Sequence, residues 1–371
     1  MQLQIPPGLT LVEGKNGHGK SNLLEAIYML SIAKSHRLNK NENGLINNKS
    51  LDKLRSGLSH TFIGADAVSR TDNNRVEIHY NYNPSNTDKF TTDKFIKING
   101  VFKKITDLIG TINSVLFTVD DLKLIFGQPS TRRRYLDILL SQTDVEYFKI
   151  LQSYRKSNTQ RNHLLKLIRE GKAQISELEF WTSEIATKGS YVIKKRQVAL
   201  HSLSELAHSF HKKLSSESEN LFCEYDSTSQ NTLADDQSYV SDSIMNKLEQ
   251  SISKDISRGS TSVGPHRDDI KIMINGIDAI DHASRGQART AVLSLKLAEA
   301  DYLKTLRNTE PILLMDDLLS ELDVNRKELI MDHISNYEQC IATTAEPNLI
   351  TELKLSNINK LTIENGNILE I

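Results

Sequence analysis

The clearest chemistry in this sequence lies in the stretch Gly14-Lys15-Asn16-Gly17-His18-Gly19-Lys20-Ser21, which fits the phosphate-binding pattern GxxxxGK[ST]. Its glycines allow the chain to curl so that backbone N–H groups point at phosphate oxygens. Lys20 would then reach the β- and γ-phosphates of a nucleotide, and the Ser21 hydroxyl would ligate Mg²⁺. The stretch predicts a site for ATP or GTP.

The segments on either side match the strand and the helix that such a loop requires. The apolar run Leu9-Thr10-Leu11-Val12 predicts a buried strand before the loop, and residues 21–30 carry apolar side chains at helical spacing after it. The start of that helix would add a positive dipole end to the loop. The alternative interpretation is that the glycine-rich stretch matches the pattern by accident. Such a match would not need a strand before it and a helix after it.

A second group of candidate residues is acidic. The apolar run Ile312-Leu313-Leu314-Met315 predicts another buried strand, and Asp316 and Asp317 follow it. Asp316 could hold Mg²⁺ or its waters, and Asp317 is a candidate base for the water that attacks the γ-phosphate. Acids after an apolar strand are a weak signal alone, but together with the phosphate loop they predict an ATPase site.

A third candidate is the loop Ser284-Arg285-Gly286-Gln287, which precedes a helix predicted to reach about Leu303. Such a loop can offer N–H groups and a hydroxyl to a phosphate, whereas the alternative is an ordinary serine cap. Because Lys20 already serves a phosphate within its own subunit, a second anion site is best explained by a nucleotide sandwiched between two chains.

The composition excludes several classes of protein. Of the 371 residues, 38% are hydrophobic and 25% charged, no apolar run could span a bilayer, and the N-terminus has no signal-peptide features. Cys223 and Cys340 lie far apart, which argues against a disulfide framework or a zinc site and suits a cytoplasmic protein. The net charge is -1, so any contact with nucleic acid must come from local basic patches.

The distribution of strand and helix patterns predicts an α/β fold with an insertion. Short apolar strands and helices fill residues 1–121 and 258–371, whereas residues 122–257 are polar with apolar side chains at helical spacing. We predict a nucleotide-binding domain (lobe I) formed by the first two segments and a mostly helical insertion (lobe II) between them. The insertion is too short for an extended coiled-coil arm.

These motifs resemble those of ABC-type P-loop ATPases. The Ser284–Gln287 loop resembles their signature motif, and Ser320-Glu321-Leu322-Asp323 resembles their D-loop. Further stretches, in family order along nearly the whole chain, are similar to the RecF family, relatives of the SMC ATPases in recombinational DNA repair: Asn22–Ile27, Ser35–Arg37, Arg132–Asp137, Gly264–Asp269 and Leu297–Ala300.

The resemblance implies an ATPase head that forms an ATP-dependent homodimer. It implies that the phosphate loop, with Asp316 and Asp317, serves one subunit's nucleotide, while Ser284 and Gly286 cap the γ-phosphate held by the other. By the same resemblance, Ser320 and Asp323 belong to the D-loop, with Asp323 at the dimer seam. Thr344 would lie near the position of the ABC switch histidine.

The resemblance also implies activity and partners. The family binds DNA, favours gaps or single-strand/double-strand junctions, and works with RecO and RecR to load RecA. We therefore expect ATP and Mg²⁺ as cofactors and a weak, DNA-stimulated ATPase whose hydrolysis acts as a switch. Another SMC-type DNA ATPase and a P-loop metabolite kinase remain the alternatives. ATP hydrolysis stimulated by DNA would indicate a RecF-like protein or another SMC-type DNA ATPase. A kinase would instead phosphorylate a small metabolite.

Two features depart from the family pattern. RecF proteins open with a strand carrying an Arg-Asn-like motif before the phosphate-loop strand. That opening is absent, so we expect the true start to lie upstream and assign no adenine-contacting residues. In addition, Thr118 stands where ABC ATPases place a glutamine after the predicted strand Val115–Phe117, which leaves one Mg²⁺ contact unassigned.

Three basic clusters are candidates for contacts with DNA. Phosphate contacts give affinity and position without sequence information, so clustered cations suffice for such binding. The alternative for each cluster is a solvated helix face or an internal set of salt bridges. The candidates are Lys34, His36 and Arg37; Arg132, Arg133 and Arg134; and the run Lys194-Lys195-Arg196.

The phosphate loop generates the first prediction. Lys20→Ala should remove most nucleotide affinity, because the β- and γ-phosphates lose the ammonium group that reaches them. Lys20→Arg keeps a charge without the compact geometry, so it should bind ATP but hydrolyse it poorly. Nucleotide titration checks both, and normal ATP binding by Lys20→Ala would show that the stretch is not a phosphate loop.

Overall fold

The computed structural model describes residues 2–37, 60–68, 73–84, 90–229, 233–346 and 358–369. The chain divides into two compact units. One, here called the strand-rich unit, consists of Met1–Val119 and Leu303–Ile371, and the other, the helical unit, is Asp120–Tyr302. None of the helices in the described residues is long and apolar enough to cross a membrane.

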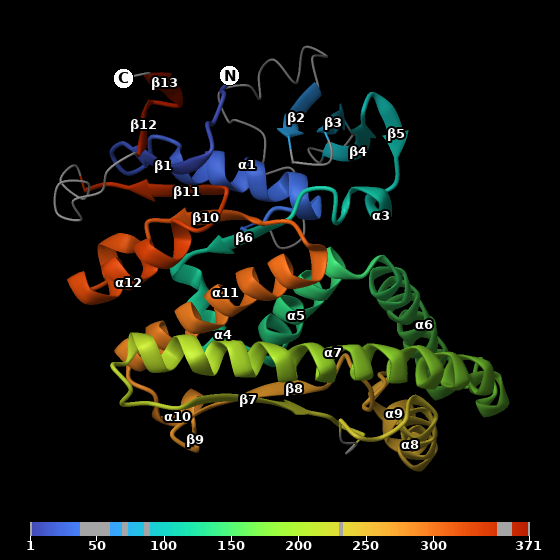
Figure 1. Cartoon of the computed structure of the whole chain (residues 1–371). Helices are drawn as coiled ribbons and strands as arrows, with labels where there is room; N and C mark the ends of the chain where they lie inside the picture. The colour runs from blue at the N-terminus through green and yellow to red at the C-terminus, as the bar shows by residue number, and fades with distance from the viewer. Residues whose placement is uncertain are drawn as a thin grey trace. The chain divides into compact units, whose positions relative to one another are not determined.

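The main sheet of the strand-rich unit has six strands in the order β13-β12-β1-β11-β10-β6 (Figure 1). All neighbours are parallel except β12 and β13. Parallel pairing places the carboxyl ends of these strands at one edge of the sheet, where ligands of α/β proteins bind. The strands are β1 (Gly8–Glu13), β6 (Ser114–Phe117), β10 (Ile312–Asp316), β11 (Gln339–Thr344), β12 (Asn359–Glu364) and β13 (Asn367–Leu369).

A second, antiparallel sheet of the same unit has the order β2-β3-β4-β5. Its β4–β5 turn is formed by Asn99 and Gly100, both with positive φ, the conformation that an Asn-Gly pair favours in a two-residue hairpin turn. Its inner face packs against helix α1 through a buried cluster that includes Met29, Val76 and Tyr80. The elements are β2 (His60–Val68), β3 (Asn73–Pro84), β4 (Phe90–Ile98), β5 (Val101–Lys103), α1 (Lys20–Ile32), α3 (Ile105–Leu108) and α12 (Val324–Ile334).

The helical unit is built around the long helix α7, with a three-stranded antiparallel sheet of β7, β8 and β9 (Figure 1). The last turn of α11, from Leu303 on, is assigned to the strand-rich unit. The elements are α4 (Lys123–Phe126), α5 (Pro129–Thr143), α6 (Val145–Arg169), α7 (Leu178–Leu214), α8 (Gln237–Gln250), α9 (Ile252–Arg258), α10 (Ala279–His282), α11 (Arg285–Arg307), β7 (Leu221–Asp226), β8 (Asp269–Ile274) and β9 (Ile277–Asp278).

The division differs from the predicted one at its second boundary. The first predicted boundary, after residue 121, lies within two residues of the structural one, but residues 258–302 belong to the helical unit rather than to the nucleotide-binding domain. Strand β7 explains the shift, because it pairs with β8 from Leu221↔Ile274 to Asp226↔Asp269. This pairing joins the end of the predicted insertion to the residues beyond it.

Buried charges connect the elements of the helical unit. The Arg196 guanidinium is 2% exposed, lies 2.8 Å from Asp137 and donates to the Pro265 carbonyl at 2.6 Å. Arg161 and Asp255 form a second, fully buried pair at 2.8 Å. Removing one partner of such a pair leaves an uncompensated buried charge, which costs about 3–5 kcal/mol. The Arg196 contacts therefore fix α7 against α5 and the 264–269 loop, and the Arg161–Asp255 pair fixes α6 against α9.

His266, in the 264–269 loop, is held in its neutral form. Its Nε2 lies 3.1 Å from the Thr261 carbonyl, which can only accept, so Nε2 carries the proton and donates. Its Nδ1 then accepts from the Tyr154 hydroxyl at 2.6 Å. Burial lowers the pKa of His266 to about 4. Both ring nitrogens are thus satisfied only in the neutral form.

The neutral histidine predicts a loss of stability in acid. In the unfolded chain the pKa of His266 returns to near 6.5, so the unfolded state binds more protons below that pH. The contribution of His266 is complete above pH 6.5 and is lost as the pH falls towards 4, by about 2 kcal/mol at pH 5. Urea unfolding at pH 7 and pH 5 should show a smaller pH dependence for His266→Gln than for wild type. Exposed His163 provides the control, since His163→Gln should leave the pH dependence of the free energy of unfolding unchanged. The same pH dependence in all three proteins would contradict the role of His266.

Candidate functional site

The loop between β1 and α1 has the shape that phosphate binding requires. Gly17 and Gly19 adopt φ values of 82° and 105°, in the left-handed region that favours glycine. At Gly14 an added Cβ would lie 2.4 Å from the carbonyl oxygen of Ile363 on β12, so no side chain fits there. The neighbouring strand β12 therefore fixes where the loop leaves the sheet.

Lys20 lies inside this loop. Its side chain is buried, and its Nζ donates to the carbonyl oxygens of Gly14 at 2.6 Å and Lys15 at 3.3 Å. Gly19, the residue before α1, supplies no side-chain cap to the helix. The N–H groups of Asn22 and Leu23 donate to the Gly19 carbonyl, which leaves those of Lys20 and Ser21, with the positive end of the helix dipole, for an anion beside the ammonium group.

The two predicted acids follow β10 as expected, and Thr343 on β11 contacts both. The Thr343 hydroxyl donates to Asp316 Oδ1 at 3.0 Å and accepts from the backbone N–H of Asp317 at 2.9 Å. Asp317 has a φ of 51°, a left-handed conformation that this hydrogen bond supports. Sequence analysis missed Thr343; its position at the end of a strand next to Thr344 was the available signal.

Arg37 joins the acidic strand end to the start of α1. Its Nη2 lies 3.2 Å from Asp316 Oδ2, and its Nη1 donates to Asn22 Oδ1 at 3.2 Å. Glu25 lies 3.8 Å from the same guanidinium and accepts a hydrogen bond from the Ser35 hydroxyl. Arg37 was predicted as a DNA contact. In the structure its guanidinium contacts Asp316 and Asn22, the residue after Ser21, while 40% of its side chain stays exposed.

The D-loop residues divide between two roles. The Ser320 hydroxyl donates to the backbone carbonyl of Asp317 at 2.8 Å and lies 3.3 Å from its Oδ1, so it helps to hold that acid. Asp323 caps α12 by accepting from the backbone N–H of Arg326 at 3.0 Å. The Asp323 side chain is 57% exposed, which leaves it accessible to another molecule.

The signature loop lies in the helical unit and forms a reciprocal cap. Ser284 Oγ accepts from the Gln287 N–H at 3.2 Å, and Gln287 Oε1 accepts from the Ser284 N–H at 2.9 Å. Ser284, Arg285 and Gly286 are exposed. A Cβ added to Gly286 would meet only Ser284 Oγ, at 3.9 Å, so the backbone there is open to approach. The serine cap and an accessible loop thus coexist.

Glu219, which sequence analysis missed, connects this loop to α7. Its Oε1 accepts from Gln287 Nε2 at 2.8 Å, and its Oε2 lies 3.1 Å from Nε2 of His211. His211 is fully buried, and burial lowers its pKa. The signature glutamine is therefore anchored to the core of the helical unit.

The Arg132–Arg134 cluster is largely internal. Arg132 is 2% exposed, binds both carboxylate oxygens of Asp269 at 2.7 Å and donates to three backbone carbonyls. Arg133 donates to the Asp268 carbonyl at 2.6 Å, and burial lowers its pKa. The structure contradicts a DNA contact by Arg132, because its guanidinium cannot reach solvent. Arg134 forms no ion pair with any residue that the structure describes.

The other basic candidates also differ in exposure. Arg196 is buried against Asp137 and cannot contact DNA, while Lys195 pairs with Asp144 at 2.6 Å. Lys194 donates to the Leu233 carbonyl at 2.5 Å. Lys34 is exposed, whereas His36 is half-buried and packs edge-on against Tyr28. The internal salt-bridge alternative thus applies to Arg132 of the second cluster and to Arg196 of the third.

Comparisons with known proteins agree along almost the whole chain. The model of the RecF/RecN/SMC N-terminal domain family matches residues 1–368. DNA replication and repair protein RecF of Lachnoclostridium phytofermentans is 34% identical over 99% of the chain and 96% of its own length. RecF of Ruminiclostridium cellulolyticum is 36% identical over 96% of the chain and 91% of its own length.

Solved structures are similar in the same way. A structure described as the recombination mediator protein RecF with ATP in the RecFOR pathway is 31% identical, with a TM-score of 0.87 over 100% of the chain and 93% of that protein. A second, described as RecF-ATPrS, is 31% identical with a TM-score of 0.86 over 99% of the chain and 92% of that protein. The fold is thus that of an ABC/SMC-type ATPase head.

Thr343 generates a prediction about stability, and Thr10 on the adjacent strand provides a matched control. Thr343→Val should lower the free energy of unfolding by about 1–3 kcal/mol, because it leaves the partly buried N–H of Asp317 without its acceptor. The Thr10 side chain is equally buried, but its hydroxyl has no hydrogen-bond partner among the described residues. Thr10→Val should therefore be neutral or stabilising. Urea unfolding compares the two variants, and an equal loss in both would argue against the role of Thr343.

Proposed function

The chain belongs to the RecF family of DNA replication and repair proteins, and from that premise we propose that it is an ATP-dependent DNA-binding protein of recombinational repair. It binds gapped DNA or single-strand/double-strand junctions as an ATP-driven dimer in the cytoplasm, and it helps RecO- and RecR-type proteins to load RecA. The observation that carries the proposal is the formed phosphate loop, joined to Asp316 through Arg37 and Asn22.

Binding of ATP is supported by the shape and charge of that loop. The Lys20 ammonium lies among backbone carbonyls that a triphosphate would replace, and the uncapped start of α1 adds N–H donors. Related structures described as RecF-ATP and RecF-ATPrS have the same fold. ATP would supply the phosphate groups that complete this polar site.

Mg²⁺ fits the residues present. Among the described residues there is no group of three or more His, Cys, Asp or Glu side chains that could hold a metal by itself. Mg²⁺ at nucleotide sites is typically held by one or two carboxylates together with phosphates and waters. Ser21 and Asp316 would form such a partial set, with the Asp316 carboxylate oriented by Thr343 and Arg37.

Hydrolysis would depend on Asp317. Its carboxylate is held by Ser320, and its backbone by Thr343, at the carboxyl edge of the sheet. From there it would orient the attacking water and accept its proton. We expect weak, DNA-stimulated turnover, which resets the dimer rather than driving a separate reaction.

Dimerisation is supported by the exposed signature loop. Ser284 and Gly286 present a hydroxyl and open backbone at the start of α11, a helix of 23 residues whose dipole favours an anion. In the proposed dimer this loop contacts the γ-phosphate bound by the partner's phosphate loop. Ser320 and Asp323 lie at the same seam.

The dimer gives the prediction that tests this function. Ser284→Arg should leave ATP binding by monomers nearly unchanged, because the phosphate loop is untouched. It should weaken ATP-dependent dimerisation at least about 10-fold, since a bulky cation replaces a small donor; this corresponds to about 1.4 kcal/mol. Light scattering with a slowly hydrolysed ATP analogue, and nucleotide titration of each protein, provide the measurements.

Two controls accompany that measurement. Ser183 is an exposed serine on α7, so Ser183→Arg adds the same cation to the same unit without touching the loop, and it should dimerise like wild type. Ser284→Ala keeps the space but removes the donor and should give an intermediate effect. Normal dimerisation by Ser284→Arg would reduce Ser284 to a helix cap and refute the shared nucleotide site.

A further inference from the structure

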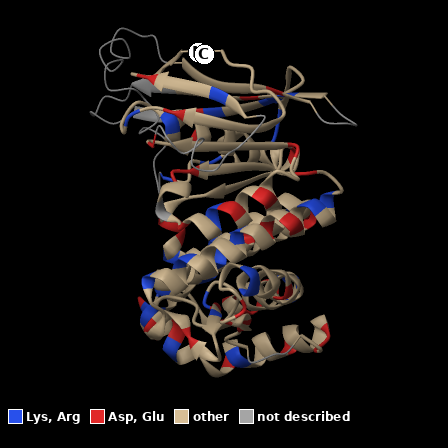
Figure 2. Cartoon of the chain, turned by 60° about the vertical axis from the view of Figure 1, so that its left-hand side comes forward, with Lys and Arg blue, Asp and Glu red and all other residues tan. Residues whose placement is uncertain are grey.

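Helix α6 has a charge distribution unlike that of the other long helices in the helical unit. From Tyr147 to Arg169 the sequence contains six Lys or Arg residues and no Asp or Glu. Acidic residues occur within α5, α7, α8 and α11, and in Figure 2 the ribbon segments of acidic and basic residues alternate along several helices. A chain with a net charge of -1 thus concentrates positive charge on one helix.

Two of these six cations are used internally. Arg161 is fully buried in its pair with Asp255. Arg155 reaches the buried Asp137 at 2.8 Å, although 60% of its side chain is exposed. Both therefore contribute to the stability of the unit, but only Arg161 is removed from the outer surface, which Arg155 shares with the other four cations.

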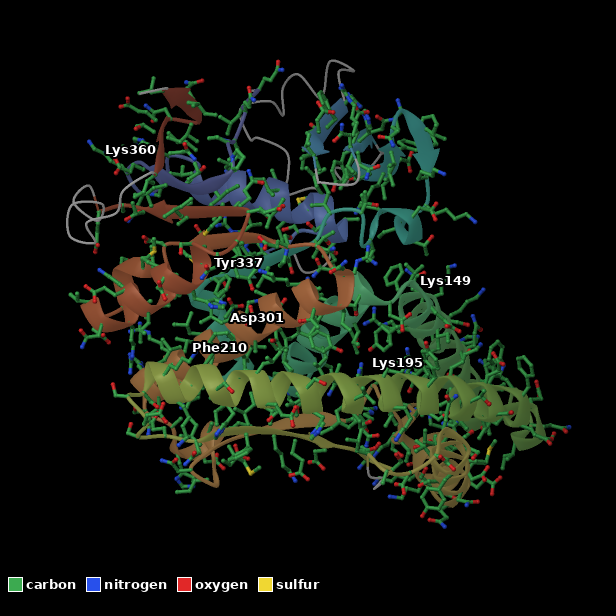
Figure 3. The ribbon with its side chains drawn as sticks, viewed as in Figure 1. Lys149, Lys195, Phe210, Asp301, Tyr337 and Lys360 are labelled. Carbon is green, nitrogen blue, oxygen red and sulfur yellow. The ribbon has the colours of Figure 1, made fainter. Side chains whose placement is uncertain are left out.

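The outer face carries the three lysines of α6, together with His163, at helical spacing. Lys149, Lys156 and His163 recur every seven residues, or about two turns, and Lys166 continues the row. All four are exposed, and the three lysines form no ion pair with any described residue. Lys149 lies in the first half of α6 (Figure 3). We define the basic face of α6 by its exposed residues Lys149, Gln152, Arg155, Lys156, Thr159, Gln160, His163, Lys166 and Arg169.

The acids that surround this face are engaged elsewhere or lie at its ends. Glu146 lies in the first turn of α6, where its negative charge interacts favourably with the positive end of the helix dipole. Glu170 lies beyond the last turn and pairs with Lys172. Glu184 of α7 pairs with Lys188, and Asp144 pairs with Lys195. No acid of α6 itself therefore neutralises the central turns.

We propose that the basic face of α6 is a docking surface for the phosphate backbone of DNA. From Lys149 to Lys166 the face is roughly 25 Å long, and a duplex carries one negative charge per about 1.7 Å of its axis. Lysines with exposed Gln and Thr between them are the side chains that bind phosphate and sugar without reading bases. This surface rests on the proposed function, which requires DNA binding but leaves its location open.

The experiment removes three charges from this face in the full-length protein. Lys149→Gln/Lys156→Gln/Lys166→Gln keeps good helix formers and should leave unfolding and ATP binding unchanged. Its affinity for a fluorescent duplex of about 20 base pairs, with ATP present, should fall about 10-fold or more at moderate salt. The slope of log affinity against log salt should decrease by about 2–3, since each phosphate contact contributes about 0.9.

The control removes three exposed lysines from other elements of the same unit; of these, Lys123 pairs with Asp120 and Lys271 with Asp226. Lys123→Gln/Lys213→Gln/Lys271→Gln should bind the duplex within about twofold of wild type. If both triple variants lose affinity equally, the effect is one of net charge and the docking surface is refuted. If the α6 variant keeps its affinity for DNA and its salt slope, the docking surface is refuted while the proposed function stands. That outcome includes the case in which the basic face of α6 binds an acidic protein. A wild-type protein that does not bind DNA at all would overturn both.

Discussion

The pairing of β1 between β11 and β12 is the constraint on which the nucleotide site depends. This register places Val12 opposite Thr343 and Glu13 opposite Thr344, so the phosphate loop begins beside the ends of the neighbouring strands. On the far side of β11, Asp316 is opposite the same Thr343. A slip of one residue would turn every side chain to the other face of its strand and separate these groups. The loop, the two acids and Thr343 are thus positioned by one set of backbone hydrogen bonds.

The helical unit depends on a different kind of contact. Its elements are joined by buried ion pairs and hydrogen bonds, among them Arg132–Asp269 and Arg196–Asp137, rather than by apolar packing alone. A desolvated guanidinium must have its donors satisfied, and each of these arginines meets a carboxylate and backbone carbonyls in one place. Such demands hold the 264–269 loop against α5 and α7. Buried ion pairs therefore determine how the elements of the helical unit pack, and they involve arginines that the sequence suggests to be on a charged surface.

The basic residues show why charge in a sequence has to be interpreted through burial. The triplet Arg132-Arg133-Arg134 is the most conspicuous cluster, yet Arg132 is used entirely inside the protein. Helix α6 has no comparable run, but its scattered lysines converge on one exposed face. Helical periodicity could have identified that row, because Lys149 and Lys156 are seven residues apart. The spacing of the lysines could not show which side of the helix is buried.

The sequence by itself determined the local elements of this protein. The strand and helix on either side of the glycine pattern before Lys20, and the apolar strand before Asp316, each form as predicted, because backbone propensity and apolar spacing are local properties. The family resemblance was also contained in these motifs. Tertiary structure alone decided the contacts between distant segments: Arg37 with Asp316, Glu219 with Gln287, and β7 with β8. Those contacts depend on which polar groups are removed from water together, and that is fixed only when the whole chain has packed.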